Sequence, residues 1–140
     1  MKSEDELLDL IAKTYSKDYI GYVKDYIAEG AIYISQWSET PVIGKEKVIE
    51  TIQHWFHYHK NFNVWMEVIK HTATEKSMAH ISLSEDGYKI NSYIIIEAEA
   101  GLITRIYSVN RNHTRRQLFM QLKEKFFGSR AIKASEQHIK

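Results

Sequence analysis

The chain has 140 residues, which suits one folded domain, and its 44% hydrophobic and 26% charged content is ordinary for a globular protein. It contains no cysteine, which excludes disulfides, thiolate metal sites and a cysteine nucleophile. The net charge of +1 is unevenly distributed. Residues 111–140 carry eight basic and two acidic side chains, a net +6, whereas residues 1–110 carry eleven basic and sixteen acidic side chains, a net −5.

No apolar run approaches the roughly 20 residues that are needed to span a bilayer. The N-terminus, from Met1 to Glu6, is too acidic to open a signal peptide. We therefore expect a cytoplasmic protein that does not enter a membrane.

Helical spacing predicts a first helix over residues 4–14 and a second from an N-cap at Ser16 to about residue 28. Alternation predicts a strand over residues 31–37, with Ile32 and Ile34 on one side. Tyr33, Ser35 and Trp37 take the other side. A third helix is expected over residues 45–59, and its apolar face carries Val48, Ile49, Ile52, Trp55, Phe56 and His59.

Four further strands are predicted over residues 63–71, 77–84, 88–98 and 102–110. Turn signals at 85–87 and 99–101 join them closely, which indicates an antiparallel, strongly curved sheet. A final amphipathic helix is expected over residues 114–127, with Leu118, Phe119, Leu122 and Phe126 on one face.

Three stretches resemble the NTF2-like superfamily, which includes SnoaL-like and steroid-isomerase-like proteins. They are Tyr26–Tyr33 (YIAEGAIY), Pro41–Ile49 (PVIGKEKVI) and Glu99–Ile106 (EAGLITRI). The resemblance implies an α+β cone in which three helices from the N-terminal half pack on a curved antiparallel sheet, followed by a C-terminal helix. It implies an NTF2-like domain over residues 1–112, with the basic helix and tail of residues 113–140 belonging to the same domain. It also implies an internal pocket and a homodimer formed through the outer face of the sheet.

The resemblance allows steroid-isomerase chemistry to be tested residue by residue. That reaction needs a carboxylate base and two donors that hold an enolate oxygen. The base position falls on Ser35, which is no base without an activating partner, and the first-helix donor position falls on Leu10 or Ile11. Only Tyr93 keeps a donor, so classical steroid isomerisation is not expected.

The same alignment predicts a mostly aromatic and aliphatic pocket for a small apolar or aromatic organic molecule. Its predicted ligand-binding residues are Tyr33, Ser35, Trp37, Trp55, Phe56, His59, Ile95, Ile106 and Ser108. The alternative is that these side chains simply fill the core. For His59 a second role is expected, because a histidine near a helix C-terminus can bind free carbonyls.

If the protein is an enzyme, we expect cofactor-free proton transfer, such as isomerisation, cyclisation or dehydration. Tyr93 and Tyr33 would orient an oxygen, and His80 or Glu67 would be the base. The alternative for Glu67 is a solvated carboxylate, and for His80 a half-buried residue with satisfied nitrogens. We expect no metal, because His54 and His57 lack a neighbouring carboxylate to complete a site.

The basic tail has three interpretations: docking on the acidic body of this chain or of a dimer partner, binding of an anionic macromolecule, or a solvated face. Nucleic acid is disfavoured, because no recognised DNA-binding motif is present and the acidic body repels phosphate. The sequence thus favours a small-molecule-binding protein, and the alternative is a non-catalytic module that binds a ligand or a protein partner.

Overall fold

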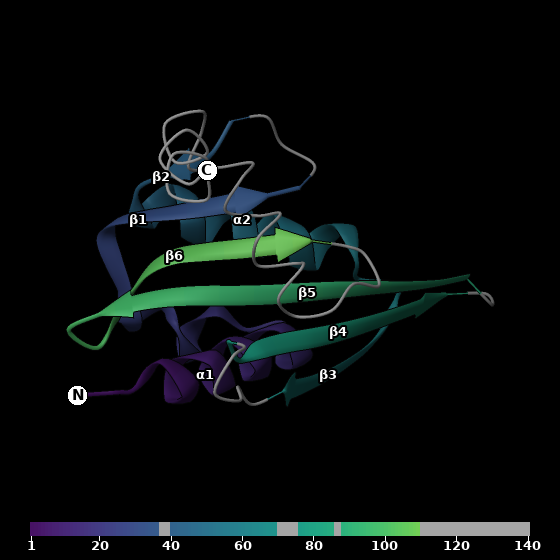
Figure 1. Ribbon diagram of the computed structural model, residues 1–140. Coiled ribbons are helices and arrows are strands. Elements are labelled where there is room, and N and C mark those ends of the chain that lie inside the picture. The colour runs from purple at the N-terminus through teal and green to yellow at the C-terminus, as the bar shows by residue number, and fades with distance from the viewer. Residues whose placement is uncertain (37–39, 70–75, 86–87, 110–140) are drawn as a thin grey trace, which may run out of the picture.

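The computed structural model describes residues 1–36, 40–69, 76–85 and 88–109 (Figure 1). The helices are α1 (Glu4–Lys17) and α2 (Lys45–Tyr58), with two short 3-10 turns at Ile20–Tyr22 and Lys24–Tyr26. The strands are β1 (Ile27–Ser35), β2 (Val42–Ile43), β3 (Asn63–Ile69), β4 (Met78–Glu85), β5 (Tyr88–Glu99) and β6 (Leu102–Val109). Trp37 and the predicted C-terminal helix lie outside the described residues.

Helix α1 begins at a capping box, in which the Ser3 side chain accepts from the Glu6 backbone N–H and the Glu6 carboxylate accepts from the Ser3 N–H. The helix ends at Asp18, whose φ of 51° lies in the left-handed region. The predicted break at Ser16 is therefore wrong. Ser16 lies inside α1, because the buried stripe of the helix runs on through Tyr15.

The predicted second helix is also wrong, since residues 20–26 form only the two 3-10 turns. Ile20, Gly21, Tyr22 and Val23 are poor helix formers, which accounts for the short turns. Strand β1 then begins at Ile27, four residues earlier than predicted. The described chain therefore packs two α-helices, rather than three, on the sheet.

The sheet has six strands in the order β2-β1-β6-β5-β4-β3. β1 pairs with β6 in parallel, and all the other pairs are antiparallel. The prediction of a wholly antiparallel sheet is therefore corrected to a mixed, mostly antiparallel one. The parallel pair is possible because α2 and four strands separate β1 from β6 along the chain. Irregular pairing between β1 and β6, and between Glu97 and Ala98 on β5, helps the sheet to curve.

Both helices lie behind the sheet in the view of Figure 1, and we call the face that they cover the inner face. Strand residues on this face, such as Ile81, Ile94 and Ile106, pack with Leu8 and Ile11 of α1 into one large core. The opposite, outer face carries a second, smaller cluster drawn from strands alone. Its buried members are Ile34, Met78, Ile95, Tyr107 and Val109. Neither described helix is long and apolar enough to cross a membrane.

Candidate functional site

An aromatic group occupies the inner face where α1 approaches α2. Tyr15, near the end of α1, meets Trp55 edge-on with ring centroids 4.7 Å apart, and Phe56 at 5.7 Å. Trp55 in turn lies against His59 at 4.3 Å. Because Trp55, Phe56 and His59 are only half-buried, they mark the place where the interior reaches the surface.

His59 closes the C-terminus of α2. Its Nδ1 atom lies 2.9 Å from the backbone oxygen of Trp55, and its own N–H donates to the same oxygen. The expected role in binding free carbonyls is therefore confirmed. The ring stays available as an aromatic wall, since it also packs against Phe62 at 5.4 Å.

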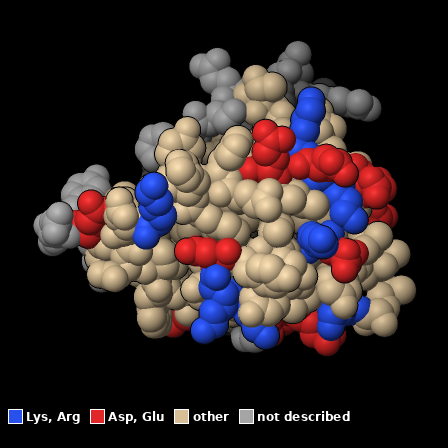
Figure 2. All heavy atoms as spheres, turned by 180° about the vertical axis from the view of Figure 1, so that it is seen from behind, with Lys and Arg blue, Asp and Glu red and all other residues tan. Residues whose placement is uncertain are grey.

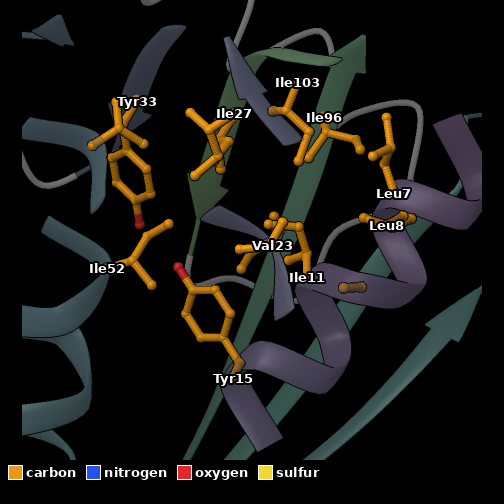
Figure 3. Packing of buried hydrophobic residues seen from close by; sticks show 14 of the residues in the cluster. Leu7, Leu8, Ile11, Tyr15, Val23, Ile27, Tyr33, Ile52, Ile96 and Ile103 are labelled. Atoms are coloured by element: carbon orange, nitrogen blue, oxygen red, sulfur yellow. The ribbon is translucent and has the colours of Figure 1, made fainter. Parts of the chain in front are cut away.

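Two phenol groups meet above this aromatic group. The hydroxyls of Tyr15 and Tyr33 point toward one another beside Ile52 (Figure 3). Tyr33 hydrogen-bonds to Ser108 on the neighbouring strand, and the buried Tyr15 hydroxyl faces Tyr33 without a well-formed hydrogen bond to any described residue. Loss of a buried hydroxyl's hydrogen bond costs about 1–3 kcal/mol, so an acceptor with better geometry than Tyr33 would stabilise the Tyr15 O–H.

Burial sets the protonation state of both phenols. It raises the pKa of Tyr15 well above its ordinary value, and the neighbouring Tyr33 raises it further. Burial likewise raises the pKa of Tyr33, and the hydrogen bonds with Ser108 and Tyr15 offset part of that increase. Both groups are therefore neutral O–H donors at physiological pH. They can hold a carbonyl or ether oxygen, but they cannot act as bases.

A second polar group lies on the outer face. His80 on β4 contacts the Glu67 carboxylate through Nδ1 at 3.4 Å and the Asn91 side-chain oxygen through Nε2 at 2.9 Å. Its ring stacks on Tyr93, with centroids 4.9 Å apart and planes 13° apart. Both ring nitrogens thus face a partner within the protein, while Glu67 stays largely in solvent.

A hollow of about 350 Å³ opens near the irregularity in β5, lined by Gly30, Ile32, Glu97, Ala98, Glu99, Thr104 and Arg105. At its wall Glu97 accepts a 2.8 Å hydrogen bond from Tyr107 and lies 3.5 Å from Arg105. Burial, followed by the hydrogen bond to Glu97, raises the pKa of Tyr107. The charges of Glu97 and Arg105 at this hollow are therefore paired with one another.

Comparison with solved structures identifies the fold. An NTF2-like protein of unknown function from Mesorhizobium loti superimposes with a TM-score of 0.63 at 10% identity, covering 78% of this chain and 91% of that one. A proposed isomerase from Bacillus subtilis gives 0.54 at 18% identity, with 91% and 98% covered. A protein with a ketosteroid-isomerase-like fold from Catenulispora acidiphila, in complex with trimethylamine, gives 0.56 at 12%, with 76% and 85% covered.

The chain has the NTF2-like fold. The NTF2-like fold that the three sequence stretches predicted is therefore confirmed. No protein-family model matches the chain, and no curated protein is similar in sequence.

The NTF2-like sheet divides the predicted site residues between its two faces. Tyr33, Ser35, Ile106 and Ser108 lie on the inner face with Trp55, Phe56 and His59 of α2, as predicted. Ile95 and Tyr93 lie on the outer face. Their expected place beside Tyr33 is therefore wrong, because successive strand side chains alternate and it is Ile94 and Ile96 that face the helices. Trp37 lies outside the described residues.

The three residues predicted as catalytic do come together, but on the outer face. Pairing of β3 with β4 sets Glu67 beside His80, and pairing of β4 with β5 sets His80 beside Tyr93. None of the three reaches the hydroxyls of Tyr15 and Tyr33, from which the sheet separates them. Within the described residues there is no group of three metal-binding side chains.

Tyr15 is the site residue that the sequence analysis missed. It was overlooked because the first helix was expected to end at residue 14. The available signal was spacing, since Tyr15 lies four residues after Ile11 and continues the buried stripe of α1. Thr14 and Ser92, which are buried without hydrogen-bond partners, were missed as well.

Proposed function

We propose that this protein binds a small, largely apolar organic molecule on the inner face, next to Tyr15 and Tyr33. The observation that carries the proposal is the buried Tyr15 hydroxyl, which faces Tyr33 without a well-formed hydrogen bond among the described residues and whose ring packs against Trp55 and Phe56. A ligand oxygen placed there would supply an acceptor with better geometry, and the aromatic rings would contact the apolar part of the ligand.

The residues favour binding over proton transfer. Apart from tyrosines, the buried polar side chains of the described residues are Thr14, Ser77, Ser92 and Ser108, none of which is a carboxylate or an imidazole. General acid–base catalysis needs a group that titrates near neutral pH within reach of the substrate. The imidazole in this aromatic group, His59, is only half-buried and is held through Nδ1 by the Trp55 carbonyl, so the predicted isomerase, cyclase or dehydratase activity would have no buried carboxylate or imidazole among the described residues as its base here.

A solved structure with this fold supports the binding of a small molecule. The Catenulispora protein with this fold was crystallised with trimethylamine, a molecule of a few heavy atoms. For the present chain the phenol donors favour an oxygen acceptor instead, so we expect an aryl or alkyl ketone, ester or ether.

The test compares acetophenone with α-methylstyrene, which replaces the carbonyl oxygen by a CH₂ group of similar shape. Calorimetry should show about tenfold tighter binding of acetophenone, because one hydrogen bond contributes on the order of 1.5 kcal/mol. Tyr15→Phe should remove this preference. Tyr19→Phe is the control, since it removes the hydroxyl of a tyrosine that is 57% exposed and whose ring packs against Tyr22.

Equal binding of the two compounds, or a preference that survives Tyr15→Phe, would contradict the proposed donor. A complementary measurement is native mass spectrometry of the protein purified from its host. A bound small molecule that is lost on denaturation would give the mass of the natural ligand. Absence of binding in both measurements would remove the proposal.

A further inference from the structure

We propose that the inner-face site takes a ligand with two polar ends, a carbonyl oxygen held beside Tyr15 and a hydroxyl group held by Ser92. This inference rests on the proposed function and narrows its ligand class to hydroxylated aromatic carbonyl compounds. The observation that carries it is a second buried hydroxyl, on a strand, that has no hydrogen-bond partner among the described residues.

Ser92 lies within β5 and faces the helices. Successive strand side chains alternate between the faces of the sheet, and Ile94, two residues further along β5, belongs to the inner core. Only 1% of Ser92 is exposed, and its hydroxyl has no partner among the described residues. Such a hydroxyl lowers stability, because its hydrogen bonds to water are lost and not replaced. A ligand group that binds the Ser92 hydroxyl would remove this cost.

The strand register brings Ser92 close to the two phenols. Pairing of β5 with β6 sets Ile94 directly opposite Ser108. Ser92 is therefore the diagonal neighbour of Ser108 on the same face, about 7–8 Å away. Ser108 hydrogen-bonds to Tyr33, whose hydroxyl faces that of Tyr15 (Figure 3). An aromatic ring with a polar substituent at each end can span the separation between Ser92 and the phenols.

Helix α1 brings a further hydroxyl to the same end of the core. Thr14, which precedes Tyr15, is fully buried and has no hydrogen-bond partner among the described residues. Leu7, on the same stripe of α1, packs in the core with Ile96, and α1 and β5 run in opposite directions (Figure 1). From there, seven helical residues rise about 10 Å and four strand residues about 14 Å, so Thr14 comes nearly level with Ser92 along the sheet.

The surroundings of these hydroxyls favour a neutral ligand group. The hydroxyls of serine and threonine can both donate and accept a hydrogen bond, as a ligand hydroxyl can. No fully buried side chain among the described residues carries a charge, so a carboxylate or an ammonium group would stay unpaired there. On the helix side of the surface, acidic and basic side chains are interspersed (Figure 2), so no field of one sign draws an ion to the site.

The test compares 4′-hydroxyacetophenone with 4′-methylacetophenone, which share the ring and the carbonyl and differ in the hydroxyl. In calorimetry, Ser92→Ala should weaken binding of the hydroxyl compound about fivefold, because one hydrogen bond is lost. Binding of the methyl compound should stay unchanged. Ser82→Ala is the matched control, since it makes the same change on the outer face of the neighbouring strand β4 and should affect neither compound.

Tyr15→Phe separates this inference from the proposed function. That variant should weaken binding of both compounds alike, because both carry the carbonyl. If Tyr15→Phe weakens both compounds but Ser92→Ala affects them equally, the inference is overturned and the proposed function stands. If neither compound binds, or if Tyr15→Phe changes the binding of neither, the proposed function is overturned and the inference with it.

Urea unfolding of the ligand-free protein gives a second, independent result. Because the hydroxyls of Thr14 and Ser92 have no partner among the described residues, Thr14→Val and Ser92→Ala should leave the urea midpoint unchanged or raise it. A lower midpoint in Ser92→Ala would show that its hydroxyl is already hydrogen-bonded in the free protein, and would overturn the proposal.

Discussion

Tyrosine hydroxyls give the interior of this protein much of its polar character. The Tyr15 hydroxyl points at the Tyr33 hydroxyl, while Tyr107 donates a 2.8 Å hydrogen bond to Glu97. All three phenols have raised pKa values, for which burial is the main cause. Each therefore stays protonated in the folded state at a pH where an unfolded tyrosine ionises.

This difference predicts alkaline instability. The unfolded tyrosines ionise near pH 10, whereas the buried ones do not, so the unfolded state loses protons first. The tyrosine contribution is fully present below about pH 10 and falls above it, by about 1.4 kcal/mol per pH unit for each such group. Urea unfolding between pH 8 and 11 should show Tyr107→Phe with a shallower decline than the parent chain. The exposed Tyr19→Phe should keep the parent slope, and an unchanged slope in Tyr107→Phe would contradict the prediction.

At the level of elements, the N-terminus of α1 is fixed by its capping box, and this positions Tyr15 three turns later. Ser3→Ala should lower the free energy of unfolding by about 1 kcal/mol, since a backbone donor loses its acceptor. Ser16→Ala should have little effect, because Ser16 lies inside the helix and only donates to the Lys13 carbonyl at 3.2 Å. Urea denaturation of both variants separates the two possible helix starts. A larger cost at Ser16 would support a second helix beginning there.

At the level of the whole molecule, the sheet buries apolar side chains on both of its faces. Ile81 on the inner face and Ile95 on the outer face are both fully buried, so replacing either by Ala should lower the free energy of unfolding by about 2–4 kcal/mol. Urea denaturation of the two variants measures both costs, and a cost below about 1 kcal/mol at either position would contradict its burial.

Local patterns in the sequence determined much of the architecture. Alternation predicted the bounds of β3 to β6 to within two residues, and the apolar stripe predicted those of α2 to within one residue. The turn at Ala100 and Gly101 has the positive φ values that a two-residue hairpin needs. These features depend on neighbours in the chain, which is why they can be read locally.

Tertiary structure decided the extent of α1, the parallel pairing of β1 with β6, and the face on which each strand side chain lies. Tyr93 and Ile95 show the reason most clearly. Alternation fixes that they share a face, but only the packing of α1 and α2 decides which face is inner. The meeting of Tyr15 with Tyr33 is likewise a contact between elements distant in sequence, which no local pattern encodes.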